Sequence, residues 1–115
     1  MSKPVGPYSP FVRAGDLVFC AGQVGIRDGA LVEGGLEAQL RQAFENLRGV
    51  LAAADCRLDD VVKTTVFLVD IADYAEMNRI YTEEFGDHRP ARSAVAVGQL
   101  PLGALVELEA IAHVS

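Results

Sequence analysis

The chain has 115 residues and a formal net charge of −6, half of its residues are hydrophobic, and its mean hydropathy is +0.22. This length is typical of one domain, residues 1–115, that buries roughly two-thirds of its unfolded surface and has no room for a deep internal cavity. A functional site is therefore expected in a surface cleft or between subunits, and the apolar excess favours contact with a second copy of the chain. The ten Lys and Arg residues are scattered, which argues against nucleic-acid binding, because such binding needs a basic patch.

Several other classes of function are disfavoured by missing motifs. The two cysteines, Cys20 and Cys56, form no CxxC motif, and the sequence has no zinc, P-loop, GxGxxG or GxSxG pattern. Neither a zinc site nor one of these common nucleotide-binding or catalytic sites is therefore expected. No apolar run reaches membrane-spanning length, and the first residues lack the apolar core of a signal peptide. These features predict a cytoplasmic protein that does not contact membranes.

The order of the predicted elements indicates an α+β fold, with two helices packed on one face of a mixed sheet. Alternating apolar residues, β-branched runs and helical stripes define the elements. Strands are expected over residues 11–14, 17–24, 61–69, 92–99 and 105–114, a short strand near 30–32 within the loop 25–35, and helices over 36–54 and 73–86.

The second predicted helix carries a polar residue in its apolar stripe. Asn78 lies among Tyr74, Met77, Tyr81 and Phe85 at helical spacing. A buried amide needs a hydrogen-bond partner, so Asn78 is expected to bind either another buried group or a ligand.

A fixed positive charge and a carboxylate in the last two strands are the strongest candidates for a site. Alternation along residues 92–99 places Arg92 and Ala94 on one face and Val95 and Val97 on the other. We expect Val95 and Val97 to pack on the helices with the apolar face of the last strand, and Arg92 to share the opposite face with Glu107. Guanidinium binds a carboxylate through two parallel hydrogen bonds, so a small carboxylate is the simplest ligand.

Alternatives to this interpretation remain open from the residues alone. Arg92 at the start of a strand is also typical of a structural ion pair. Glu109 lies two residues after Glu107 on the same face, and strand spacing does not say which carboxylate matters. Tyr8 lies in the rigid turn Gly6-Pro7-Tyr8-Ser9-Pro10, where an aromatic residue most often only packs.

Several motifs in order along the chain resemble one known family. They are Gly6-Pro7-Tyr8, Gly22-Gln23, Lys63-Thr64-Thr65-Val66-Phe67-Leu68, Met77-Asn78-x-x-Tyr81, Pro90-Ala91-Arg92-Ser93 and Val106-Glu107-Leu108-Glu109-Ala110-Ile111-Ala112. Together they resemble the Rid family of reactive intermediate deaminases, also called YjgF-type proteins, over nearly the whole chain.

The resemblance implies a homotrimer of chorismate-mutase-like subunits with clefts at the subunit interfaces. It also implies a cofactor-free hydrolysis: enamines such as 2-aminoacrylate tautomerise to 2-imino acids, which then give 2-keto acids and ammonia. By the same resemblance, Arg92 holds the substrate carboxylate, Glu107 activates water or relays a proton, backbone groups near Ala94 bind the substrate, and Tyr8 and Asn78 line the cleft.

Two positions depart from the common pattern of this family. Ala94 stands where well-studied members often have cysteine, and Ala21 where they often have serine or threonine. A different substrate range is one consequence to test. Two other roles stay open: a trimer that binds a small carboxylate without turnover, and an interaction protein related to chaperones or translation.

Overall fold

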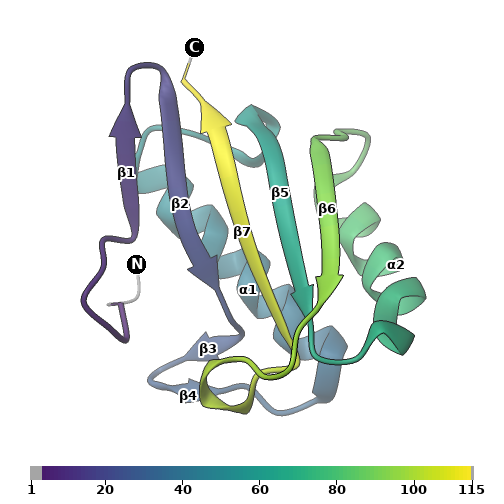
Figure 1. Ribbon diagram of the computed structural model, residues 1–115. Coiled ribbons are helices and arrows are strands. Elements are labelled where there is room, and N and C mark those ends of the chain that lie inside the picture. The colour runs from purple at the N-terminus through teal and green to yellow at the C-terminus, as the bar shows by residue number, and fades with distance from the viewer. Residues whose placement is uncertain (1–3, 115) are drawn as a thin grey trace.

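The computed structural model describes residues 4–114, which form one mixed sheet backed by two helices (Figure 1). The sheet has the strand order β1-β2-β7-β5-β6, and a separate small hairpin pairs β3 with β4. The strands are β1 (Phe11–Ala14), β2 (Leu17–Gln23), β3 (Ile26–Arg27), β4 (Ala30–Leu31), β5 (Val61–Leu68), β6 (Ala91–Ala96) and β7 (Val106–His113), and the helices are α1 (Gly35–Ala53) and α2 (Tyr74–Phe85).

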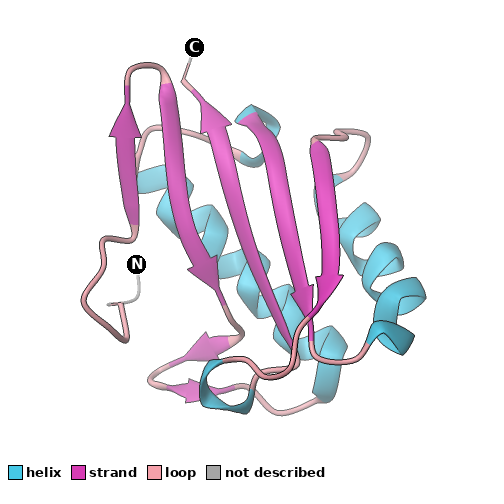
Figure 2. Ribbon diagram, viewed as in Figure 1, coloured by secondary structure: helices cyan, strands magenta, loops and turns pink. Residues whose placement is uncertain are grey.

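Both helices cover the same face of the sheet and leave the other face open (Figure 2). β5 and β6 are parallel and are connected through α2, whereas the other neighbouring strands are antiparallel. The predicted α+β fold with a mixed sheet and helices on one face is confirmed. No helix within residues 4–114 has both the length and the hydropathy needed to cross a membrane.

The alternation of residues along the central strand β7 explains why the helices pack on this face. Val106, Leu108, Ala110 and Ala112 alternate along β7 and are almost completely buried against α1 and its neighbours. Such alternation buries one face of a strand and leaves the other available. The predicted helix-facing side of the last strand is thus confirmed.

The predicted packing of β6 is wrong in one respect. Val95 is 43% exposed and lies on the open face, whereas Ala94 packs against the core on the helix side. The alternation along the strand was predicted correctly, but its two faces were exchanged. The smaller residue lies beneath the helices, and the larger one lies on the face that the single chain leaves uncovered.

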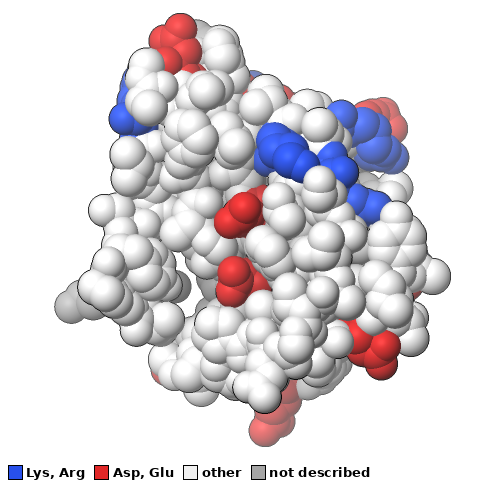
Figure 3. All heavy atoms as spheres, viewed as in Figure 1, with Lys and Arg blue, Asp and Glu red and all other residues white. Residues whose placement is uncertain are grey.

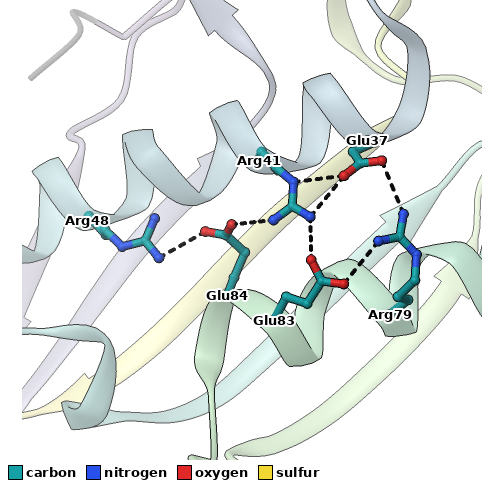
Figure 4. Close-up of polar contacts among 6 residues, drawn as sticks. All are labelled: Glu37, Arg41, Arg48, Arg79, Glu83 and Glu84. Atoms are coloured by element: carbon teal, nitrogen blue, oxygen red, sulfur yellow. Dashed lines mark hydrogen bonds and ion pairs between the residues drawn. The ribbon is translucent and has the colours of Figure 1, made fainter.

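A network of charged side chains joins α1 to α2 (Figure 4). Arg41 pairs with Glu37 one turn earlier, and it also reaches Glu83 and Glu84 of α2 at 2.6 and 2.8 Å. The side chain of Glu84 is only 13% exposed, so its pair with Arg41 is largely shielded from solvent. Arg48 and Arg79 complete the network, which links α2 to α1.

Candidate active site

Arg92 lies at an edge of the sheet, on the face that the helices cover. Its strand, β6, is the last in the sheet order, and Arg92 is paired with Thr64 of β5. Thr64 is completely buried, and its hydroxyl lies 2.6 Å from that of Tyr81 in α2. Because paired residues of neighbouring strands point to the same side, the side chain of Arg92 points toward α2.

Side chains of α2 surround the guanidinium of Arg92. Its Nη2 donates to the hydroxyl of Tyr74 at 3.0 Å, and its Nη1 lies 3.7 Å from the sulfur of Met77. Its Cζ lies 4.8 Å from the ring centre of Tyr81, within the range of a cation–π interaction. Among residues 4–114, no carboxylate forms an ion pair with Arg92, so the structural ion pair considered above is not found there.

Asn78 and Ala94 lie on the same side of the sheet as Arg92. Asn78 follows Tyr74 by one helical turn, and its Oδ1 is buried without a hydrogen-bond partner among the described residues. Of the two expected partners, another buried group or a ligand, the first is not found for this oxygen among the described residues. Ala94 follows Arg92 on the same face of β6 and is half-buried opposite Val66.

Glu107, in contrast, lies on the open face of the sheet. It pairs with Phe67 of β5, which is three residues after Thr64, the partner of Arg92. Residues three apart on a strand point to opposite faces. The prediction that Arg92 and Glu107 share a face is therefore wrong: within one chain the sheet separates them, because Arg92 takes the helix side.

The carboxyl group of Glu107 has an unusual environment. Burial, and secondarily the charge of Glu109, raise its pKa above the ordinary value for glutamate. Gly22 of β2 lies against it, since a Cβ on Gly22 would stand 2.4 Å from Oε2 of Glu107. Glu109 is exposed on the same face, opposite Thr65. This environment makes Glu107 a candidate for acid–base chemistry.

Tyr8 lies in the N-terminal turn, and it lines one cavity together with Gly22, the residue that lies against Glu107. It is 46% exposed, and its hydroxyl accepts a hydrogen bond from the backbone N–H of Val5 at 3.3 Å. A small cavity of about 50 Å³ lies under this N-terminal turn and reaches Gly22. Its lining is mainly apolar: Pro4, Val5, Tyr8, Pro10, Gly22, Gln23, Val24, Ile26, Asn46 and Val50.

The candidate residues therefore divide into two groups within one chain. We call the first the arginine half-site: Arg92, Tyr74, Met77, Asn78 and Ala94. The second is the glutamate half-site: Glu107, Gly22 and Tyr8. Among residues 4–114, Arg92 in the first group has no carboxylate paired with it, and Glu107 in the second has no cation paired with it.

The open face that carries Glu107 is mostly uncharged (Figure 3). Acidic groups lie near its middle, with basic groups toward one side. Phe19, Val12 and Val95 are each more than 40% exposed on this face, and a cleft of about 340 Å³ runs past Phe19, Lys63, Thr65, Glu109 and Ile111. Apolar exposure of this kind on one side of a sheet is typical of a surface that a protein partner covers.

The sequence patterns did not predict three members of the two half-sites as site residues. Tyr74 was assigned only to an apolar stripe, and a hydroxyl at a helix start carries no signal for an arginine bond. Gly22 carries a weak signal, because glycine inside a strand often marks a close approach of another group. Met77 gives no signal beyond its place in the apolar stripe.

Among residues 4–114, no group of three His, Cys, Asp or Glu side chains is placed to share a metal ion.

Known proteins resemble this chain over nearly its full length. The family model described as Endoribonuclease L-PSP matches residues 1–114. A RutC family protein of Pyrococcus horikoshii is 48% identical over 113 residues, covering 96% of this chain and 90% of that protein. A mouse protein named 2-iminobutanoate/2-iminopropanoate deaminase is 44% identical over 110 residues, covering 94% and 82%.

Solved structures agree with these sequence matches. The crystal structure of RidA from the Antarctic bacterium Psychrobacter sp. PAMC 21119 has a TM-score of 0.93 at 39% identity, covering 97% of this chain and 92% of that one. E. coli TdcF with bound serine has a TM-score of 0.91 at 35% identity, covering 97% and 91%. The chain belongs to the Endoribonuclease L-PSP family, and the resemblance to the Rid or YjgF-type proteins is confirmed.

Proposed function

We propose that this chain hydrolyses small 2-imino acids, and the enamines in equilibrium with them, to 2-keto acids and ammonia. The observation that carries the proposal is Arg92, a guanidinium that protein side chains orient but that no carboxylate among residues 4–114 neutralises. Relatives named 2-iminobutanoate/2-iminopropanoate deaminase, at 42–44% identity, support the reaction class.

The reaction needs one anchor and one group that exchanges protons. Arg92 binds the substrate carboxylate and thereby fixes the adjacent imine carbon. Glu107 accepts a proton from water as the water oxygen bonds to that carbon, and it passes this proton to the imine nitrogen, which gives a carbinolamine. Glu107 then takes the hydroxyl proton of the carbinolamine as the C=O bond forms, the C–N bond breaks with its electron pair leaving on nitrogen, and the same proton passes to the departing ammonia. No oxidant or reductant is required.

The two half-sites must come from different copies of the chain for this chemistry to occur. Within one chain the sheet lies between Arg92 and Glu107, so one bound imino acid does not reach both. A homotrimer, as the family resemblance implies, would bring the arginine half-site of one subunit to the glutamate half-site of the next. The exposed apolar residues of the open face support such an association.

The remaining candidates take binding roles in this arrangement. The unsatisfied oxygen of Asn78 accepts a hydrogen bond from the substrate or from the neighbouring subunit. The backbone of Ala94 lies beside the anchor, and Tyr8 closes the cleft from the glutamate side.

Release of keto acid from an imino acid made in situ by an amino-acid oxidase tests the activity. Wild type is compared with two site variants, Arg92→Lys and Glu107→Gln. Arg92→Lys keeps the positive charge but loses the two-pronged geometry of the guanidinium. Arg13→Ala is the control, because it removes an exposed arginine elsewhere in the chain. Acceleration by wild type and the control, and its loss in the two site variants, supports the proposal. No acceleration by folded wild type across several side-chain sizes contradicts it.

Mixing two inactive variants tests whether the site is shared. If equal amounts of Arg92→Ala and Glu107→Gln subunits reassemble, about a quarter of interfacial sites regain both groups. Activity should then return to roughly that fraction of wild type. A site within one subunit would stay inactive in every mixture.

A second candidate function is the binding of a small carboxylate without turnover. E. coli TdcF has serine bound, and serine also presents a carboxylate to an arginine. In that case Glu107→Gln leaves binding of pyruvate or serine intact, and wild type shows no acceleration of imine hydrolysis.

A further inference from the structure

The contacts of the arginine half-site assign a role to a residue outside the predicted site. We infer that Tyr74 is a positioning residue: its hydroxyl fixes the orientation of the Arg92 guanidinium and so sets the affinity for the substrate carboxylate. The inference rests on the proposed function, because it concerns the same anchor.

The guanidinium of Arg92 meets few acceptors among the described residues. A guanidinium has five N–H donors in one plane and no acceptor. One donor of Nη2 goes to the Tyr74 hydroxyl at 3.0 Å, and Nη1 contacts the sulfur of Met77 at 3.7 Å. The bond to Met77 is weak because a thioether is a poor acceptor. The hydroxyl of Tyr74 is therefore the one strong acceptor that Arg92 meets among the described residues.

Two aromatic rings also lie near the guanidinium of Arg92, but they do not fix its rotation. The ring centre of Tyr81 lies 4.8 Å from Cζ of Arg92, and that of Tyr74 lies 5.6 Å away. Ring contacts attract a cation but define its rotation poorly, because a ring face offers no single acceptor atom. A hydrogen bond at a defined atom does restrict rotation about the last bonds of the side chain. Without the Tyr74 hydroxyl, the guanidinium keeps both rings but loses its orienting acceptor.

The orientation of the guanidinium affects how tightly Arg92 binds a carboxylate. Two-pronged binding requires two N–H groups of the fork to point at the carboxylate together. A guanidinium that is already oriented loses less freedom when the ligand binds, and affinity rises accordingly. This effect is the same in the substrate complex and in the transition state, so it changes KM and leaves kcat nearly constant.

The position of Tyr74 makes the test clean. Tyr74 is the first residue of α2, and it is 42% exposed. Tyr74→Phe removes one oxygen from a partly exposed side chain and keeps the ring, so folding is retained. Ala75→Ser, at an exposed position in the same helical turn, is the matched control.

The experiment measures KM and kcat for imine hydrolysis, the Kd for pyruvate by calorimetry, and thermal unfolding. Tyr74→Phe should raise KM and the Kd for pyruvate in parallel by about tenfold, as expected for one hydrogen bond to a charged group at a partly exposed site. Its kcat should stay within about twofold of wild type, and Ala75→Ser should match wild type throughout.

Each other result is also informative. An unchanged KM and Kd for Tyr74→Phe, with or without a change in unfolding temperature, overturns the positioning role. A fall in kcat at constant KM also overturns it, because the hydroxyl would then act in the transition state. If wild type binds pyruvate but hydrolyses no imine, the proposed function fails while the Kd of Tyr74→Phe still tests the inference. If wild type does neither, both fail.

Discussion

Glycine at position 22 makes room for the carboxylate that the proposed reaction needs. A Cβ on Gly22 would lie 2.4 Å from Oε2, 2.8 Å from Cδ and 3.1 Å from Cγ of Glu107. Ordinary contacts of a Cβ begin at 3.4 Å. Gly22→Ala therefore forces the carboxylate of Glu107 to move by about 1 Å, judged from the shortest of these contacts.

The expected cost falls on activity more than on stability. A displacement of about 1 Å at a catalytic group reduces the rate on the order of 100-fold, or about 2.7 kcal/mol in activation free energy. The atoms that must move belong to one flexible side chain. Rotation of that side chain away from its preferred rotamer costs about 0.5–1.5 kcal/mol, so the variant should fold.

Imine hydrolysis and thermal unfolding of Gly22→Ala measure both effects. Gly49→Ala is the matched control: a Cβ at Gly49 in α1 meets nothing within 4 Å, so activity should stay at the wild-type level and stability should rise by about 0.5–1 kcal/mol. In a Glu107→Gln background, Gly22→Ala should have little further effect on the rate, because the group that it displaces is already inactive. Wild-type activity in a folded Gly22→Ala would refute the reasoning.

The surroundings of Glu107, Tyr81 and Cys20 lead to three further predictions. Glu107 must be ionised to accept a proton, and because its pKa is raised, activity should fall as the pH drops through a value above the ordinary glutamate range. Glu109→Gln should lower the pKa of Glu107 and so shift the acid limb of a pH–kcat/KM profile to lower pH. Tyr81→Phe should destabilise the chain by about 1–3 kcal/mol in denaturant unfolding, because it leaves the buried hydroxyl of Thr64 unpaired, and adding Thr64→Val should recover part of that loss. Burial raises the pKa of Cys20 to about 11, so its thiol should react with a colorimetric thiol reagent only after unfolding; fast reaction in the folded protein would contradict this.

The sequence predicted most elements because their signals are local. Residues 61–69 carry many β-branched side chains, and the structure has β5 over Val61–Leu68. Gly86 was expected to end the second helix, and it does so with φ 68°. The short strand predicted near residues 30–32 is confirmed as β4. Its partner β3 was missed, although Asp28-Gly29 is typical of a tight two-residue turn and both residues have positive φ. Each strand of this hairpin has only two residues, too few for periodicity to show.

The faces of the strands were harder to predict than the strands themselves. Alternation correctly grouped Arg92 with Ala94, but it does not say which group faces the helices. The prediction placed the larger apolar residue, Val95, against the helices, together with the apolar face of the last strand. Val95 instead belongs to a surface that a single chain leaves open, and one-chain periodicity does not distinguish a core from an interface.

The separation of Arg92 from Glu107 has a chemical advantage in the proposed assembly. If one chain brought the two together, they would form a closed ion pair, which occupies the guanidinium and lowers the pKa of the carboxyl. Separation by the sheet leaves the guanidinium available and the pKa of Glu107 raised. At a shared site, the substrate carboxylate neutralises the arginine of one subunit, so the glutamate of the next keeps its affinity for a proton. The anchor and the base are then both functional only when the substrate lies between them.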